Sequence, residues 1–411
     1  IDVVSGEVML TFDPQGVVTM DYQWSDIPVP YTDVYSDRYG IDNYYAGNGN
    51  LVCIFGDFGY SGATNHGTLC ASAVVGQGKT YGSYVQGFAP EAKILAIGDI
   101  YIGSTVDAWY FLVEGYDGNP ASGDGAHLAS NSFGYGLSND GWDYYSRFTD
   151  WLTTHYADGK VLFTASAGNS GHGYGSISEP SAPAVLTVGA ATHMYYRLLG
   201  ELNYDGGPDP LGGDVIPFSS RGPTTVGYPG VDVTAIGAFA FGADLLNWEN
   251  PYGHNWDLGT SPTDGFYSIE LWSGTSLSAS SAMGLLALAY QAYYENNDNE
   301  YPDLFTARQI AMGGADDKGY DTFVGGAGYM NADVMTDMAS GAGGISTWPE
   351  IWYPGEYLGS QAELTAHLMF PGEEWTSEFE LTDWGGGTGA VSIEAQRLER
   401  THVMELSLIH I

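Results

Sequence analysis

Ser276 stands between a Gly-Thr pair and a long apolar segment, which is a suitable setting for a nucleophilic serine. Residues 282–290 are almost all apolar and predict a helix that begins near the serine. The N–H groups and the positive potential at a helix N-terminus stabilise the negative oxygen that forms during acyl transfer. Ser is also a preferred N-cap residue, so a purely structural cap is the alternative interpretation.

His66 lies in the run Asn65-His66-Gly67-Thr68, ahead of a second small apolar segment. A histidine at a helix start suits a general base, and the glycine beside it lets another segment come close. The alternative is an ordinary loop histidine, since the chain has nine.

Two further motifs follow segments that we predict to be strands. Asn169, in Ala167-Gly168-Asn169, can aim its side-chain amide at an oxyanion, although a turn asparagine is the common alternative. Residues 132–134, Ser-Phe-Gly, can pair with a peptide as an added strand or simply end their own strand.

The elements that must position these residues alternate between strands and helices. Strands are predicted over residues 51–55, 93–97, 128–131, 161–165, 185–188 and 231–235, and helices over 68–75, 106–113, 144–156 and 276–294. This alternation predicts an α/β domain with a mostly parallel sheet, whose reactive residues gather at the carboxyl ends of the strands. Residues 197–230 and 238–268 are rich in Gly, Asn, Asp and Pro and predict surface loops or insertions.

Composition narrows the classes of function. The 411 residues include 50 acidic and 11 basic ones, and the resulting net charge of −39 disfavours binding to nucleic acid or anionic membranes. No run of 18 apolar residues is present, so no membrane span is expected. Cys53 and Cys70 lack a Cys-x-x-Cys spacing, which leaves one disulfide or two buried thiols rather than a metal or redox centre.

The ordered set of motifs between residue 50 and about residue 335 resembles the subtilisin-like serine peptidases, the subtilases. The strand, His-Gly-Thr, Ser-Phe-Gly, Ala-Gly-Asn and Gly-Thr-Ser motifs follow in the family's order. Residues 87–94 are similar to the family's Gly-x-Ala-Pro-x-Ala segment, and residues 186–190, 218–223 and 231–235 also match in place. The resemblance implies a three-layer α/β subtilase core and a serine endopeptidase, a hydrolase that acts through an acyl-enzyme.

The resemblance also implies a role for each site residue, by its position in the matching motif. The resemblance implies that Ser276 is the nucleophile, that His66 is its general base, and that Asn169 and the backbone N–H of Ser276 form the oxyanion hole. Residues Ser132, Phe133 and Gly134 would line the substrate-binding site on the non-primed side.

The third member of a Ser-His-Asp triad is the weakest part of the match. The family's Asp-Thr-Gly or Asp-Ser-Gly is missing from the sequence. Asp57 follows the strand at residues 51–55, but this strand takes the place of the family's second strand, and Asp13 is followed by Pro14 instead of a small residue. We therefore expect the catalytic Asp to precede residue 1, in a chain that is a fragment, and keep Asp57 as the candidate within it.

Three alternatives remain open. Cys70 as the nucleophile is disfavoured, because a residue four positions along the same helix does not face the attack side of the imidazole. A sedolisin-type enzyme, with Glu and Asp instead of His, is disfavoured by the His66 motif. A non-catalytic pseudopeptidase that binds peptides or assembles on surfaces is supported by the missing Asp alone.

The resemblance also implies a division of the chain into domains. Residues 1–49 would be an N-terminal part or insertion, 50–339 the peptidase domain, and 345–405 the start of a small, truncated β-sandwich-like segment with strands over 363–370 and 376–381. Residues 406–411 resemble a translated sequencing-adapter end. Polypeptide substrates and a secreted or cell-surface location are expected, with no cofactor required. Calcium is compatible as a structural ion, and no metal-ligating residues are assigned.

Overall fold

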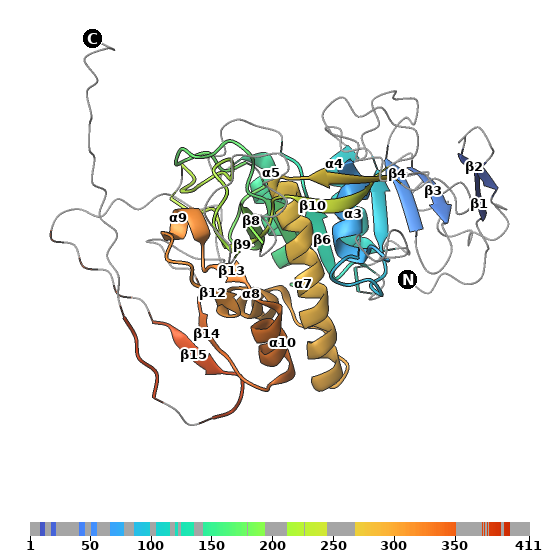
Figure 1. Ribbon diagram of the computed structural model, residues 1–411. Helices are drawn as coiled ribbons and strands as arrows, with labels where there is room; N and C mark the ends of the chain where they lie inside the picture. The colour runs from blue at the N-terminus through green and yellow to red at the C-terminus, as the bar shows by residue number, and fades with distance from the viewer. Residues whose placement is uncertain are drawn as a thin grey trace, which may run out of the picture.

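A six-stranded sheet forms the centre of the computed structural model (Figure 1). Its strands are, in spatial order, β12 (Ala315–Asp316), β13 (Tyr329–Met330), β9 (Val233–Ile236), β8 (Val185–Ala191), β7 (Leu162–Ser166) and β6 (Leu128–Asn131). All neighbouring pairs from β13 to β6 are parallel, and only β12 is antiparallel to its neighbour. The described residues are 9–12, 18–21, 41–45, 51–55, 66–77, 86–98, 104–115, 120–121, 125–134, 143–178, 180–193, 212–225, 227–244, 268–350, 372, 374, 376, 378–387 and 390–394.

The burial of the two central strands, β7 and β8, explains why their sequences are so apolar. Every residue of β7 and β8 is buried, because helices cover both faces of the sheet. On one face, α4 (Ser104–Glu114), α5 (Tyr144–Trp151) and the π-helical turn η4 (Leu152–Tyr156) contribute to a core with β6, β7 and the start of β8.

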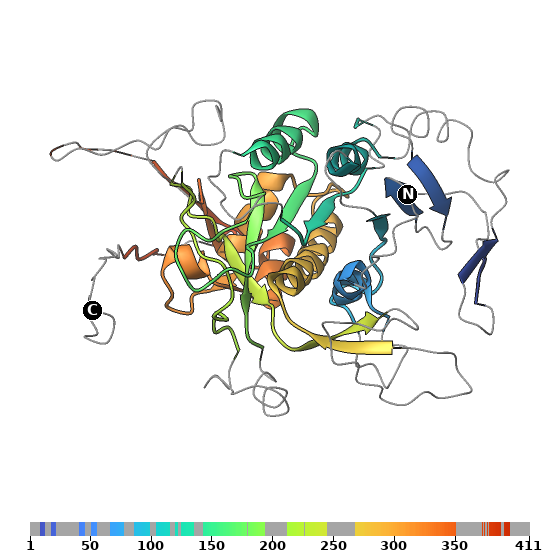
Figure 2. The same ribbon diagram turned by 90° about the horizontal axis from the view of Figure 1, so that it is seen from above.

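The opposite face carries the other helices. There, α7 (Thr275–Asn296), α8 (Leu304–Gly313) and α10 (Ala332–Ser340) share a core with β7, β8 and β9. Seen from above, the sheet lies between the two helix layers (Figure 2). The predicted three-layer α/β fold with a mostly parallel sheet is confirmed.

A smaller sheet holds the strands that precede and follow the histidine motif. β4 (Leu51–Phe55) pairs in parallel with β5 (Leu95–Gly98) and antiparallel with β3 (Ile41–Tyr45). Helix α3 (His66–Val75) comes between β4 and β5 in the chain and packs against α7. A separate hairpin joins β1 (Met9–Phe12) to β2 (Val18–Asp21).

Two parts of the chain differ from the sequence-based expectation. Residues 238–268 were predicted to be loop, but β10 (Ala240–Asp244) pairs antiparallel with β11 (Ser268–Trp272). The pairing was not predicted because the two strands are more than twenty positions apart and the residues between them are rich in Gly and Asn. No elements were predicted over residues 295–339, where the structure has α8, α9 (Thr322–Gly325), α10 and two short strands.

The C-terminal β-segment is only partly described. β14 (Ile345–Trp348) pairs antiparallel with β15 (Glu380–Asp383), so the strand predicted over 376–381 begins at Glu380 instead. The strand predicted over 363–370 lies outside the described residues. Within the described part of the chain, no helix combines the length and the apolar character needed to cross a membrane.

Candidate active site

Ser276 is the second residue of α7, and the N-cap position belongs to Gly274. The interpretation of Ser276 as the cap is therefore wrong. Its hydroxyl donates a hydrogen bond to the carbonyl oxygen of Ser132 at 3.1 Å, instead of accepting one from the helix start. The residue is largely buried, with 9% of its surface exposed.

The segment after β6 is tied directly to the candidate nucleophile. The hydrogen bonding is reciprocal, because the hydroxyl of Ser132 donates to the carbonyl oxygen of Ser276 at 3.1 Å. The hydroxyl of Ser280 donates to the same oxygen at 2.9 Å. Ser280 thus bonds within the first turns of α7.

His66 is the first residue of α3 and packs edge-on against Trp272, the last residue of β11, with 6.1 Å between ring centroids. Burial lowers the pKa of His66, which favours the neutral imidazole that a general base needs. Its Nδ1 lies 3.9 Å from the Sγ of Cys70, one turn along the helix.

Cys70 connects the histidine to the serine. Burial raises the pKa of its thiol, and hydrogen bonds with the side chains of Ser280 and Ser132 act in the opposite direction. Those two serines both contact Ser276, so one thiol bridges the surroundings of His66 and Ser276. Cys70 is a free cysteine, and a thiol kept protonated by burial is a poor nucleophile.

Asn169 follows β7 and reaches the start of α7. Its Oδ1 accepts hydrogen bonds from both the backbone N–H and the hydroxyl of Thr275, each at 2.9 Å. A backbone N–H can only donate, so the atom facing it must be the amide oxygen, and Nδ2 is the remaining donor.

Gly274 shows where that donor lies. A Cβ atom added to Gly274 would stand 3.8 Å from the Nδ2 of Asn169 and 3.7 Å from the backbone nitrogen of Ser276. Two N–H donors thus border one small space beside the serine, the arrangement expected of an oxyanion hole. Gly274 has a φ of 157° and a ψ of 161°, a backbone region that is essentially restricted to glycine.

Phe133 and Gly134 continue the segment beyond Ser132. The ring of Phe133 stacks on Trp109 of α4, with 6.4 Å between centroids, and Gly134 is exposed. β6 is the last strand of the six-stranded sheet and pairs with β7 on its inner side. Residues 132–134 therefore follow a strand at the sheet edge, near Ser276.

The structure does not place every predicted residue. Asp57, like Asp13, lies outside the described residues, so the site as described contains the serine, the histidine and the asparagine. Among the described residues, no group of three or more His, Cys, Asp or Glu side chains is arranged to hold a metal ion. The role of Thr275 as the anchor of Asn169 was not predictable from the sequence, because a residue 106 positions away gives no local signal.

The model of the subtilase family matches residues 55–343. Serine protease AprX of Bacillus subtilis (strain 168) is 26% identical over 279 residues, which are 65% of this chain and 57% of AprX. The chain thus spans little more than half the length of this relative.

Two solved structures are also similar to the chain. The patellamide maturation protease PatA is 23% identical, covers 71% of this chain and 89% of its own, and gives a TM-score of 0.47. The prenylagaramide maturation protease PagA is 21% identical, with coverages of 67% and 83% and a TM-score of 0.46. The match of the family model over most of the sequence shows that the chain belongs to the subtilase family.

Proposed function

We propose that this subtilase is an active serine endopeptidase that cleaves polypeptides through an acyl-enzyme on Ser276. The observation that carries the proposal is the anchored amide of Asn169, whose Nδ2 borders the same space as the backbone N–H of Ser276. Such a pair of donors serves a reaction in which an oxyanion develops beside the serine.

In the proposed reaction, His66 removes the hydroxyl proton as Ser276 Oγ attacks the substrate carbonyl carbon. Asn169 Nδ2 and Ser276 N donate to the tetrahedral oxyanion. His66 then gives the proton to the leaving amine, and a water molecule hydrolyses the acyl-enzyme by the same steps in reverse order.

The resting hydrogen bond of Ser276 has a consequence for this reaction. Its hydroxyl donates to the carbonyl oxygen of Ser132, so it must turn toward His66 before attack. A peptide that pairs with residues 132–134 would offer a backbone N–H to the same carbonyl. Substrate binding would therefore release the nucleophile.

A carboxylate that faces the imidazole would complete the triad and stabilise the protonated histidine. Asp57 is our candidate within the printed sequence. Within the described residues, the Nδ1 atom of His66 has the Sγ of Cys70 at 3.9 Å.

A fluorophosphonate probe tests the proposal directly, because it labels serines that are activated for attack. We expect stoichiometric labelling of Ser276, no labelling of Ser276→Ala, and strongly reduced labelling of His66→Ala. Thermal melting of each protein serves as the folding control. A folded wild-type protein that resists the probe would overturn the peptidase proposal and favour a non-catalytic, peptide-binding role.

A further inference from the structure

Trp272 links the two reactive residues through one short stretch of chain. It is the last residue of β11 and stands four positions before Ser276. Its indole meets the imidazole of His66 almost at a right angle, with 6.1 Å between ring centroids and 81° between ring planes. The segment that leads into the proposed nucleophile therefore also contacts the proposed general base.

The indole is enclosed in a small core of its own. Trp272 is 8% exposed and shares one apolar cluster with Leu69 of α3 and Leu277 of α7. Leu69 lies three positions after His66, and Leu277 directly follows Ser276. The ring of Trp272 is thus the shared packing partner of the two helix starts that carry the reactive side chains. Side chains in such a core are held in few rotamers.

Strand β10 closes in on the same ring. A Cβ atom added to Gly242 of β10 would stand 2.9 Å from Nε1 of Trp272 and 2.6 Å from Cδ2 of Leu69. These distances are shorter than normal contacts of a Cβ atom, so a side chain at this position would displace its neighbours. The glycine lets the strand approach α3 closely enough to confine the indole.

The chain between the indole and the serine is anchored by its backbone. The backbone N–H of Gly274 donates to the carbonyl oxygen of Gly237 at 2.8 Å. The hydroxyl oxygen of Ser273 accepts from the backbone N–H of Phe239 at 2.9 Å. The position of the Trp272 ring is therefore coupled to the position of Ser276.

The imidazole of His66 depends on packing for its orientation. Among the described residues, the titratable side chain beside it is Cys70, whose Sγ is a weak hydrogen-bond partner at 3.9 Å from Nδ1. Burial lowers the pKa of His66, and no charged group of the described residues contributes to the shift. The surroundings of the ring are thus largely apolar, and the indole of Trp272 is part of them.

We propose that Trp272 is a positioning residue for the general base: its indole holds the imidazole of His66 in one orientation for proton transfer and keeps water from that side of the ring. The inference rests on the proposed peptidase function. A misplacement of about 1 Å can cost about 10²-fold in rate, so a ring that fixes the base has a large effect without touching the substrate.

Kinetics of two variants test the proposal. Trp272→Leu stays apolar but loses the flat ring, and we expect kcat to fall by about 10²-fold with little change in KM. Trp272→Phe keeps a ring and should restore most of kcat. Tyr290→Leu is the matched control, because it removes a buried aromatic ring further along α7; it should leave kcat unchanged even where melting shifts.

An NMR titration of His66 gives a readout that does not require activity. The signal is identified by its absence in His66→Gln. Because the smaller side chain of Trp272→Leu lets water reach the imidazole, the pKa of His66 should rise toward about 6.5, the value of a free histidine. Trp272→Phe and Tyr290→Leu should leave it near the wild-type value.

The outcomes separate this inference from the peptidase proposal. A wild-type protein that reacts with the fluorophosphonate probe, together with a folded Trp272→Leu that keeps wild-type kcat, overturns the role of Trp272 alone. A wild-type protein that resists the probe defeats the peptidase proposal. In that case the titration still decides the contact, and an unchanged pKa of His66 in Trp272→Leu overturns it.

Discussion

Asn169 receives two hydrogen bonds from one residue, since both the backbone N–H and the hydroxyl of Thr275 donate to its Oδ1 at 2.9 Å. The hydroxyl of Thr275 also accepts from the backbone N–H of Gly168 at 3.2 Å. These three contacts join the end of β7 to the start of α7. They fix the side-chain amide before any substrate arrives, and such preorganisation is the basis of electrostatic catalysis.

Replacement of Asn169 by Ala should lower kcat by about 10²–10³, the range established for the oxyanion-hole asparagine of subtilisin, with a much smaller change in KM. Thr275→Val is the matched control, because it keeps the backbone donor to Oδ1 and removes only the hydroxyl. It should reduce kcat less. Steady-state kinetics on a peptide amide substrate checks both. A variant without Asn169 that retains nearly full kcat would show that the amide does not hold the oxyanion.

Gly274→Ala should damage activity and stability together. The added methyl group would stand 3.7 Å from the nitrogen of Ser276 and 3.8 Å from Nδ2 of Asn169, in the space that we assign to the oxyanion. The backbone conformation of Gly274 also costs on the order of 1–3 kcal/mol for other residues. We expect a large loss of kcat and a lower urea midpoint. Gly343→Ala, after α10 and outside the site, is the control, since nothing lies within 4 Å of its added methyl group.

The sequence was informative about the site because each reactive residue lies beside a strongly patterned element. Ser276, His66 and Asn169 each adjoin a segment whose apolar composition predicted a helix or a strand, and the hydrogen bonds from Thr275 to Asn169 join two of these segments. The contacts that hold them were not predictable. Thr275 and Asn169, or Arg308 and Asp232, come together only in the folded chain. The pairing of β10 with β11 was missed for the same reason.

Asp150 should make stability depend on pH. Its Oδ1 accepts from the backbone N–H of Ala184 at 2.8 Å, its Oδ2 is buried without a partner among the described residues, and burial raises its pKa to about 7. The folded state therefore keeps a proton that the unfolded state loses near pH 4. The contribution of this proton is complete below about pH 4 and is lost as the pH rises to about 7.

Asp150→Asn keeps an acceptor for Ala184 and cannot ionise. Relative to the wild type, its free energy of unfolding should increase from pH 5 to about pH 7 and then level off, as measured by urea titration at each pH. Asp143→Asn, which alters the N-cap of the same helix, controls for local effects. A difference between Asp150→Asn and the wild type that stays constant over this range would contradict the shifted pKa.

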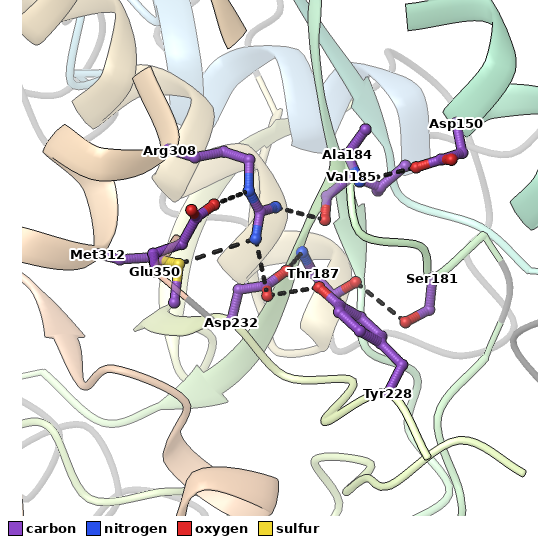
Figure 3. A network of polar contacts seen from close by, with 10 residues as sticks. All are labelled: Asp150, Ser181, Ala184, Val185, Thr187, Tyr228, Asp232, Arg308, Met312 and Glu350. Carbon is purple, nitrogen blue, oxygen red and sulfur yellow. Dashed lines mark hydrogen bonds and ion pairs between the residues drawn. The ribbon is translucent and has the colours of Figure 1, made fainter. Parts of the chain in front are cut away.

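Arg308 should be among the most sensitive positions for stability. Its guanidinium spans Glu350, Asp232 and the carbonyl oxygen of Val185 (Figure 3), so Arg308→Met would leave two buried carboxylates without their shared counter-charge. Removal of one partner from a buried ion pair typically costs about 3–5 kcal/mol. Arg308→Lys keeps the charge but not the planar guanidinium that reaches three acceptors. Its stability should therefore lie between that of the wild type and that of Arg308→Met.

Lys318→Met supplies the contrast, because the pair of Lys318 with Asp316 is partly exposed, and such pairs contribute less than about 1 kcal/mol. Urea unfolding of the three variants should therefore rank Arg308→Met as the least stable and Lys318→Met as close to wild type. An Arg308→Met variant no less stable than Lys318→Met would contradict the role of Arg308 as the shared counter-charge of Asp232 and Glu350.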